Sequence, residues 1–193
     1  MTPSDSSRPH FPPRPTALAQ QILRPLIQQG DLVIDATAGN GHDTAFLADC
    51  VGATGRVLAF DIQAAALVSA KARVGDRSWV DFFHESHAAI GTHAAPQSVA
   101  AIMFNLGYLP GEDHDLTTEA AETLQALGVA ATLLKPGGVL SVICYPGHPA
   151  GAAEAAEVES WATNLAHQGW RVARYGTLGN RRPAPFLLLV TPA

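Results

Sequence analysis

Charged residues and cysteines are both scarce in this chain of 193 residues. Only 15% of the residues are charged, and 12 Lys and Arg against 17 Asp and Glu give a net charge of −5. This balance argues against a protein that holds nucleic acid through bulk electrostatics, so any contact with RNA must be local. The two cysteines, Cys50 and Cys144, are too few for a disulfide scaffold or a cysteine zinc site. Their apolar surroundings favour two buried thiols in a reducing cytoplasm.

Long hydrophobic runs are also missing. No apolar stretch approaches the roughly 18 residues that a membrane-spanning helix needs. Residues 1–15 lack the apolar centre of a signal peptide and contain five prolines, so we expect a tail without regular structure. The length fits one ordinary domain, which we place at residues 16–193. These absences predict a cytoplasmic protein without a membrane partner.

What the chain does have is a 47% hydrophobic composition, distributed in short apolar runs that alternate with helical patterns. The runs predict seven strands, at 32–37, 56–61, 79–83, 99–105, 139–145, 170–175 and 186–190. The helical patterns lie at 16–29, 44–51, 64–74, 87–93, 119–134 and 152–168. Strands that are apolar along their whole length and alternate with helices indicate a mostly parallel sheet with helices on both faces. We therefore expect a single α/β, Rossmann-like domain.

Turn signals refine this picture in three places. Thr16 is a candidate N-cap for the first helix, which we expect to stop at Gly30 with a kink at Pro25. Residues 134–138, Leu-Lys-Pro-Gly-Gly, predict a turn before the fifth strand. The segment 176–185 is too short to hold a crossover helix, so the last two strands should pair antiparallel as a hairpin.

A glycine-containing turn follows the first strand, in Asp35-Ala-Thr-Ala-Gly-Asn-Gly-His-Asp-Thr. Gly39 and Gly41 allow close approach of a ligand to the backbone, and the helix that follows offers free N–H groups. Asp61 ends the second strand twenty residues after Gly41, where it can accept hydrogen bonds from ribose hydroxyls. A tight turn without a ligand is the alternative. The coincidence of both features favours an adenosine-type cofactor at the carboxyl ends of the strands.

The residues of the turn discriminate between cofactors. A dinucleotide site requires a third glycine or alanine, but Thr44 stands at that position. The carboxylates of Asp35 and Asp43 would repel a diphosphate, whereas they suit the ammonium and sulfonium groups of S-adenosyl-L-methionine. A nicotinamide-dependent oxidoreductase and a catalytically silent nucleotide-binding subunit are the remoter alternatives.

Several further motifs together resemble one family. They are DATAGNGHDTAFLA (35–48), AFDIQ (59–63), ESHAAI (85–90), FNLGYLPGEDH (104–114), LLKPGGVLSVICYPGHPAG (133–151) and APFLLLV (184–190). The combination is similar to the small class I methyltransferases of the MnmM (YtqB-like) type, long labelled rRNA methylases. The resemblance covers nearly the whole chain after residue 15, and the pair NLGYLPG plus YPGH is specific for it.

The resemblance implies methyl transfer from S-adenosyl-L-methionine to the aminomethyl group of 5-aminomethyl-2-thiouridine at the tRNA wobble position. It also implies a homodimer that acts on the anticodon stem-loop without an added RNA-binding domain. The residues we expect at the cofactor are Asp35, Thr37, Gly39, Asn40, Gly41, His42, Asp43, Asp61, Ile62, Gln63, Ser86, His87 and Asn105. An exposed histidine at a helix start is the alternative for His87.

Three residues are candidates for the chemistry. Asn105 ends the fourth strand, where related amino-methylating enzymes place an acceptor for the target amine, and Tyr108 is a candidate to stack on the base. An alkylamine with a pKa near 10 is mostly protonated at pH 7, so desolvation and acceptors such as the Asn105 oxygen must favour the neutral form. His148 could accept a proton or hold the uridine. A plain turn at Asn105 and a loop histidine at His148 are the alternatives.

A local basic patch is expected at Arg181 and Arg182, in the loop between the last two strands and near Arg171 and Arg174. Phosphate contact and a simple solvated turn are both open there. No His, Cys or acidic spacing suggests a metal site. Within the same cofactor class, an rRNA base or a small-molecule amine remains an alternative acceptor.

Overall fold

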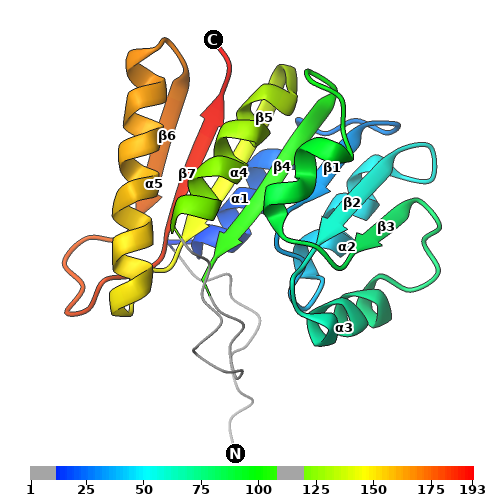
Figure 1. Ribbon diagram of the computed structural model, residues 1–193, viewed down its shortest axis with the longest axis horizontal. Coiled ribbons are helices and arrows are strands. Elements are labelled where there is room, and N and C mark those ends of the chain that lie inside the picture. Colours follow the sequence, from blue (N-terminus) through cyan, green and yellow to red (C-terminus); the bar gives the residue numbers. More distant parts are fainter. Residues whose placement is uncertain (1–11, 108–119) are drawn as a thin grey trace, which may run out of the picture.

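The computed structural model describes residues 12–107 and 120–193 and shows one seven-stranded sheet of order β3-β2-β1-β4-β5-β7-β6 (Figure 1). The strands are β1 (Leu32–Asp35), β2 (Arg56–Phe60), β3 (Val80–Phe83), β4 (Val99–Leu106), β5 (Leu134–Cys144), β6 (Arg171–Gly176) and β7 (Phe186–Thr191). Strands β1 to β5 pair in parallel, and β7 is antiparallel to β5 and β6. The predicted fold and its terminal hairpin are confirmed. Most of the expected proline-rich tail lies outside the described residues.

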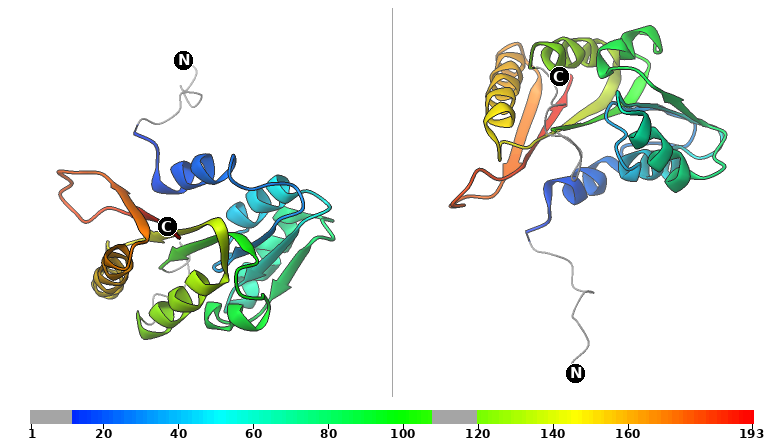
Figure 2. Two further views of the ribbon diagram at one scale, coloured as in Figure 1. Left: turned by 90° about the horizontal axis from the view of Figure 1, so that it is seen from above. Right: turned by 60° about the horizontal axis from the view of Figure 1, so that its bottom comes forward.

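Helices cover both faces of this sheet (Figure 2). They are α1 (Pro15–Leu23), α2 (His42–Val51), α3 (Ala64–Val74), α4 (Ala120–Leu133), α5 (Pro149–His167) and the 3-10 helix η1 (His87–Thr92). Successive β4 residues serve opposite faces, as the alternation of a strand requires. Phe104 is buried in the cluster that contains Leu127 of α4, and Met103 in the cluster that contains Leu47 of α2. This double coverage explains why the central strands are apolar throughout.

The first helix differs from the sequence-based expectation at both ends. It begins at Pro15 with Arg14 as the N-cap and no side-chain cap, so the predicted cap at Thr16 is wrong. Proline suits the first helical position because its missing N–H has no partner there in any case. The helix ends at Leu23 and does not continue to Gly30 with a kink. Pro25 lacks the amide hydrogen that would bond to the carbonyl of residue 21.

The expected turn at 134–138 lies within β5. Val99 pairs with Leu134 and Ala101 with Val139, so the four residues between these partners form a bulge opposite Ala100. Lys135, in this bulge, forms an ion pair with Asp31 at the start of β1. The bulge therefore adds an ionic contact at the amino end of the sheet.

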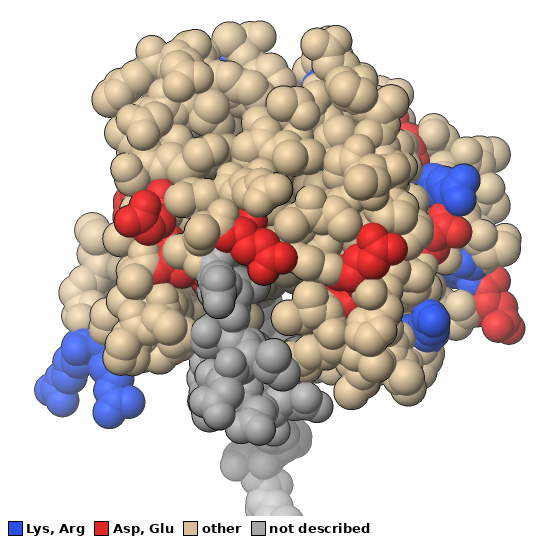
Figure 3. Space-filling model, in the orientation of Figure 1, with Lys and Arg blue, Asp and Glu red and all other residues tan. Residues whose placement is uncertain are grey.

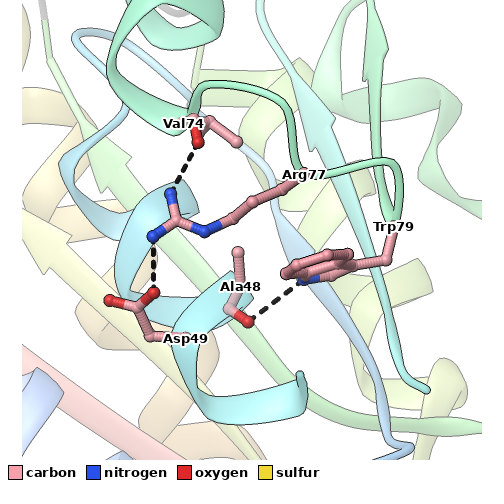
Figure 4. A network of polar contacts seen from close by, with 5 residues as sticks. All are labelled: Ala48, Asp49, Val74, Arg77 and Trp79. Atoms are coloured by element: carbon pink, nitrogen blue, oxygen red, sulfur yellow. Dashed lines mark hydrogen bonds and ion pairs between the residues drawn. The ribbon is translucent and has the colours of Figure 1, made fainter. Parts of the chain in front are cut away.

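A small polar network connects α2, α3 and β3 (Figure 4). The Arg77 guanidinium donates to the Val74 carbonyl at 2.6 Å and pairs with Asp49 at 2.7 Å. The Trp79 indole donates to the carbonyl of Ala48 at 3.1 Å. These contacts hold the second half of α2 against the connection between α3 and β3.

The cysteines differ in burial. Cys144 is buried at the end of β5, and desolvation raises the pKa of its thiol to about 12. Cys50, on α2, is only partly buried, so the expectation of two buried thiols is wrong for this one. Part of its side chain is in contact with solvent.

Candidate active site

The turn after β1 is held in a shape that requires glycine. Gly39 and Gly41 have φ angles of 49° and 76°, in the left-handed region that side chains disfavour. A Cβ on Gly41 would lie 2.6 Å from the Cα of Ala70 on α3. The Arg73 side chain donates to the carbonyl of Asn40 at 2.7 Å and ties the turn to the same helix. The turn and the start of α2 are therefore fixed relative to α3.

Asp61 lies directly after β2 and holds this turn from the other side. Its carboxylate accepts a hydrogen bond from the Gly39 amide at 2.8 Å and another from the Gln63 amide at 2.9 Å. Each carboxylate oxygen can accept more than one hydrogen bond, so the two amides do not exhaust this group. Asp61 is partly exposed at the carboxyl edge of the sheet. It can thus accept from a vicinal diol while its orientation stays fixed by the backbone.

Asp35, the last residue of β1, is fully buried. Its carboxylate accepts hydrogen bonds from the Thr44 hydroxyl at 2.6 Å and from the Thr37 amide at 3.2 Å. Burial, together with the nearby charge of Asp43, raises the pKa of Asp35 to about 7. The side chain therefore supports the turn from inside the protein and presents no surface to solvent.

Asp43, in the first turn of α2, connects two distant elements. One carboxylate oxygen accepts a hydrogen bond from the side-chain Nε2 of Gln20 on α1 at 2.6 Å. The other accepts from the side-chain Nδ2 of Asn105 on β4 at 2.7 Å. The backbone N–H of Asn105 donates to the Thr37 hydroxyl at 2.7 Å. Because the side-chain nitrogen of Asn105 donates to Asp43, the Oδ1 atom of Asn105 remains available as an acceptor. That oxygen is buried and has no hydrogen-bond partner among the described residues.

Two further buried polar atoms lie beyond the ends of β2 and β3, on Gln63 and His87. His87 is 5% exposed, its Nε2 atom is without a partner in the described structure, and burial lowers its pKa, which favours the neutral ring. The Gln63 Oε1 atom is likewise buried without a partner there. Ser86 caps η1 through the amide of Ala88 and also donates to Glu122 of α4. The exposed-histidine alternative for His87 is therefore wrong.

The remaining predicted site residues differ in accessibility. His42 is exposed at the start of α2, and Ile62 is 47% exposed beside Asp61. Tyr108 lies outside the described residues. His148 caps α5, because its Nδ1 atom accepts from the Gly151 amide at 3.1 Å. This contact fixes the ring orientation and leaves Nε2 as the nitrogen that bears the proton in the neutral form.

The two arginines predicted to contact RNA lie on the loop between β6 and β7, where both are exposed. Figure 3 shows basic side chains at this corner of the molecule and acidic side chains in a row across the same face. Arg171 lies at the far end of β6 and Arg174 near the loop, so only Arg174 belongs to this region. Within the described part of the chain, no group of three or more His, Cys, Asp and Glu side chains could hold a metal ion. No helix in residues 12–107 or 120–193 is long and apolar enough to span a membrane.

The structure also shows contacts that sequence reasoning missed. Gln20 positions Asp43 from 23 residues away, Thr44 donates to Asp35, and Glu122 accepts from Ser86 across 36 residues. Gln20 and Glu122 occupy ordinary polar positions of helical patterns, and nothing local marks them. Thr44 could have been identified, because a hydroxyl in the first turn of a helix faces the strand tip that precedes it.

Comparison with known proteins identifies the family of the chain. The family model described as "Putative rRNA methylase" matches residues 57–191. The chain is 38% identical over 188 residues to the tRNA (mnm(5)s(2)U34)-methyltransferase, chloroplastic, of Arabidopsis thaliana, covering 91% of this chain and 68% of that protein. The resemblance stated from the sequence motifs is thereby confirmed, and the oxidoreductase alternative is set aside.

Two solved structures are similar over nearly their whole length. A "putative rRNA-methylase" from Clostridium thermocellum has a TM-score of 0.88 and 33% identity, with 93% of this chain and 98% of that chain covered. A "putative methyltransferase" from Streptococcus mutans, in complex with SAH, has a TM-score of 0.83 and 30% identity with the same coverage. From the family match and these relatives, the chain belongs to the "Putative rRNA methylase" family of methyltransferases.

Proposed function

We propose that this protein is an S-adenosyl-L-methionine-dependent N-methyltransferase that modifies the aminomethyl group of 5-aminomethyl-2-thiouridine at the tRNA wobble position. Methyl transfer from S-adenosyl-L-methionine follows from the family and from the SAH complex of the Streptococcus mutans relative. The tRNA substrate rests on the Arabidopsis relative, whose name specifies position U34. The structural observation that supports an amine acceptor is the buried Oδ1 atom of Asn105, which has no hydrogen-bond partner among residues 12–107 and 120–193.

The residues at the carboxyl edge fit this cofactor. Asp61 is held so that it can accept from the ribose hydroxyls, and Gly39 and Gly41 leave the turn free of side chains where the methionine part would pass. The Gln63 Oε1 atom is a buried acceptor suited to the exocyclic amine of adenine, and the neutral His87 ring lies in the same region. When bound, S-adenosyl-L-methionine supplies a methyl group on a positively charged sulfur.

The acidic groups below the turn contribute charge. Asp43 is 7% exposed and Asp35 has no exposed surface, and both carboxylates are hydrogen-bonded within the protein. We infer that Asp43 attracts the ammonium and sulfonium groups of the cofactor through its negative potential, since its hydrogen-bonding positions are largely filled. Asp35, whose pKa is raised to about 7, adds a full negative charge only above neutral pH. This arrangement also disfavours a diphosphate at the same turn.

Asn105 positions the target amine. Its Oδ1 atom can accept one N–H of the neutral amine, which orients the nitrogen lone pair away from the strand and toward the cofactor. Asp43 keeps the Asn105 amide from rotating, because a rotated amide would direct its oxygen at a carboxylate. The proton of the alkylammonium form leaves to water before the amine enters the site, so no strong general base is required. Tyr108 as a stacking residue and His148 as a group near the uridine complete the proposal.

The proposed substrate contact outside the site is electrostatic. Arg181 and Arg182 are exposed and suited to phosphates of the anticodon stem-loop. Figure 3 shows basic side chains at this corner and a row of acidic side chains away from it. The family resemblance further supports a homodimer in the cytoplasm. Light scattering during size-exclusion chromatography would report a mass of twice 20.2 kDa if the dimer forms.

A small-molecule amine is the second candidate acceptor. Two observations favour it: the net charge of −5 and the row of acidic side chains that Figure 3 shows on one face of the molecule. Such a surface repels RNA phosphates but attracts a free ammonium compound.

The decisive experiment is incubation with labelled S-adenosyl-L-methionine and bulk tRNA from cells that lack this protein. We expect label in the tRNA, and a decrease of roughly 10- to 100-fold for Asn105→Ala, the loss of one oriented hydrogen bond at the reacting nitrogen. Asp76→Ala, an exposed change away from the carboxyl edge, serves as the matched control. Absence of label in any tRNA, while S-adenosylhomocysteine still binds, would reject the tRNA substrate and favour an rRNA or small-amine acceptor.

A further inference from the structure

A groove lies between α5 and the loop that joins β6 to β7. The loop is at the lower left of Figure 1. Its volume is about 390 Å³, within the range of small-ligand sites. One wall consists of small side chains of α5, including Ala152 and Ala156, and the opposite wall is formed by Asn180 and Arg182 of the loop. The groove is wide because the α5 wall lacks bulky side chains, and the loop wall is polar.

The charges around the groove are unequal. The Arg174 guanidinium lies 4.2 Å from the ring centroid of Phe186 and pairs with Glu159 at 2.8 Å, so its charge is compensated. Arg181 and Arg182 are exposed and take part in no ion pair among the described residues. On a protein with a net charge of −5, two uncompensated arginines beside a groove favour an anionic ligand at that point.

The groove borders the proposed active site. Asn105 pairs with Ile143 across β4 and β5, and Pro146, which lines the groove, follows three residues after Ile143. A Cβ on Gly107 would lie 3.5 Å from the Tyr145 side chain, so the chain beyond Asn105 packs directly on the residue before Pro146. A strand of RNA whose target base reaches Asn105 would thus have its neighbouring nucleotide at the groove.

We propose that this groove binds the ribonucleotide next to the modified one in a single-stranded RNA loop, a proposal that rests on the proposed function. The phosphate between the two nucleotides contacts Arg182, with Arg181 adding to the attraction. The sugar and base lie against the alanine wall and beside the Arg174 guanidinium, whose carbon lies 4.2 Å from the centroid of the Phe186 ring. The groove would account for how an acidic protein holds RNA.

Two substitutions test the groove, each with a matched control. Arg182→Ala removes the phosphate contact, and Arg171→Ala removes the same charge at the far end of β6. Ala156→Leu fills the groove from an exposed position, and Ala153→Leu adds the same bulk to an exposed position of α5 that does not line it. The midpoint of thermal unfolding reports whether each variant remains folded.

The measurement is the Kd of a fluorescent anticodon stem-loop that carries the aminomethyl uridine, determined over a series of salt concentrations. We expect Arg182→Ala to raise Kd about tenfold and to reduce the salt dependence by roughly one phosphate contact. Ala156→Leu should raise Kd several-fold without altering the salt dependence, because it changes no charge. The two control variants should bind as the wild type does.

A neutral methylphosphonate placed at either linkage next to the target nucleotide locates the contact. At the linkage that contacts Arg182, it should weaken wild-type binding about as much as Arg182→Ala does. The methylphosphonate and Arg182→Ala combined should raise Kd little more than either change alone. If Arg182→Ala and Ala156→Leu both bind the RNA as tightly as the wild type and still methylate tRNA, the proposed role of the groove is wrong and the proposed function is unaffected. A wild-type protein that neither binds nor methylates the RNA would overturn both.

Discussion

Replacement of the buried carboxylate Asp35 by asparagine should change stability in a way that depends on pH. The stability of the variant, minus that of the wild type, should increase as the pH rises. Asparagine keeps the shape of the side chain. Its oxygen can still accept from the Thr37 amide, and its amide can donate to the Thr44 hydroxyl. What the substitution removes is the negative charge in a fully buried position beside Asp43.

The sign and size follow from proton binding. Burial and the charge of Asp43 raise the pKa of Asp35 from 3.8 to about 7, so between these values the folded wild type holds a proton that the unfolded chain has released. Wild-type stability therefore falls as pH rises through this range, and the loss is nearly complete above pH 7. Between pH 5 and pH 8 this group lowers the free energy of unfolding by about 2 to 3 kcal/mol, since one pKa unit corresponds to about 1.4 kcal/mol. The asparagine variant has no carboxylate at this position and therefore lacks this pH-dependent loss of stability.

The assay is urea unfolding of both proteins at pH 5, 6, 7 and 8 without cofactor. The stability of Asp35→Asn minus that of the wild type should increase by about 2 to 3 kcal/mol over the series, or about 5–10 °C in Tm for a domain of this size. Asp76→Asn, an exposed carboxylate, is the matched control and should show a constant difference. A difference for Asp35→Asn that does not change with pH would refute the reasoning.

Three further perturbations test other parts of the structure. Asp61→Ala removes the acceptor for two backbone amides and should weaken S-adenosylhomocysteine binding at least tenfold by calorimetry; unchanged affinity would exclude Asp61 from the cofactor site. Gly41→Ala places a Cβ 2.6 Å from the Cα of Ala70 at a φ of 76°, which should cost at least about 2 kcal/mol in urea unfolding, and a neutral effect would contradict the packing described. Trp79→Phe loses the hydrogen bond to the Ala48 carbonyl and should cost about 1 kcal/mol or more, whereas a stabilised variant would show that this bond contributes nothing.

The arrangement of strands and helices could be predicted from the sequence because it depends on periodicity. The central strands are apolar on both sides, and helical patterns separate them, which leaves a parallel sheet covered on both faces as the consistent fold. The helix at 64–74 was predicted with the bounds observed. The errors fall where proline changes the backbone, as at Pro25, and where a bulge absorbs a segment that reads as a turn, as in β5.

Only the site residues that lie at the ends of strands could be predicted from the sequence. Asp35, Asp61 and Asn105 lie at the tips of strands that a parallel sheet brings to one edge, and the structure places them there. The contact between Gln20 and Asp43 depends on how α1 packs against the sheet, which no local pattern encodes. The Asn105 Oδ1 atom, which has no partner in the described part of the chain, likewise depends on its surroundings, since the hydrogen bond from Asn105 Nδ2 to Asp43 fixes which way this oxygen points.

The central claim is methyl transfer to the amine on the wobble uridine, and the most direct test identifies the methylated atom. Wild-type enzyme is incubated with S-adenosyl-L-methionine and tRNA bearing 5-aminomethyl-2-thiouridine, and the digested nucleosides are fragmented in a mass spectrometer. The account predicts one added methyl group in the side-chain fragment, strongly reduced with Asn105→Ala. A methyl group on the ribose or on the pyrimidine ring, or no methylated nucleoside at all, would contradict it.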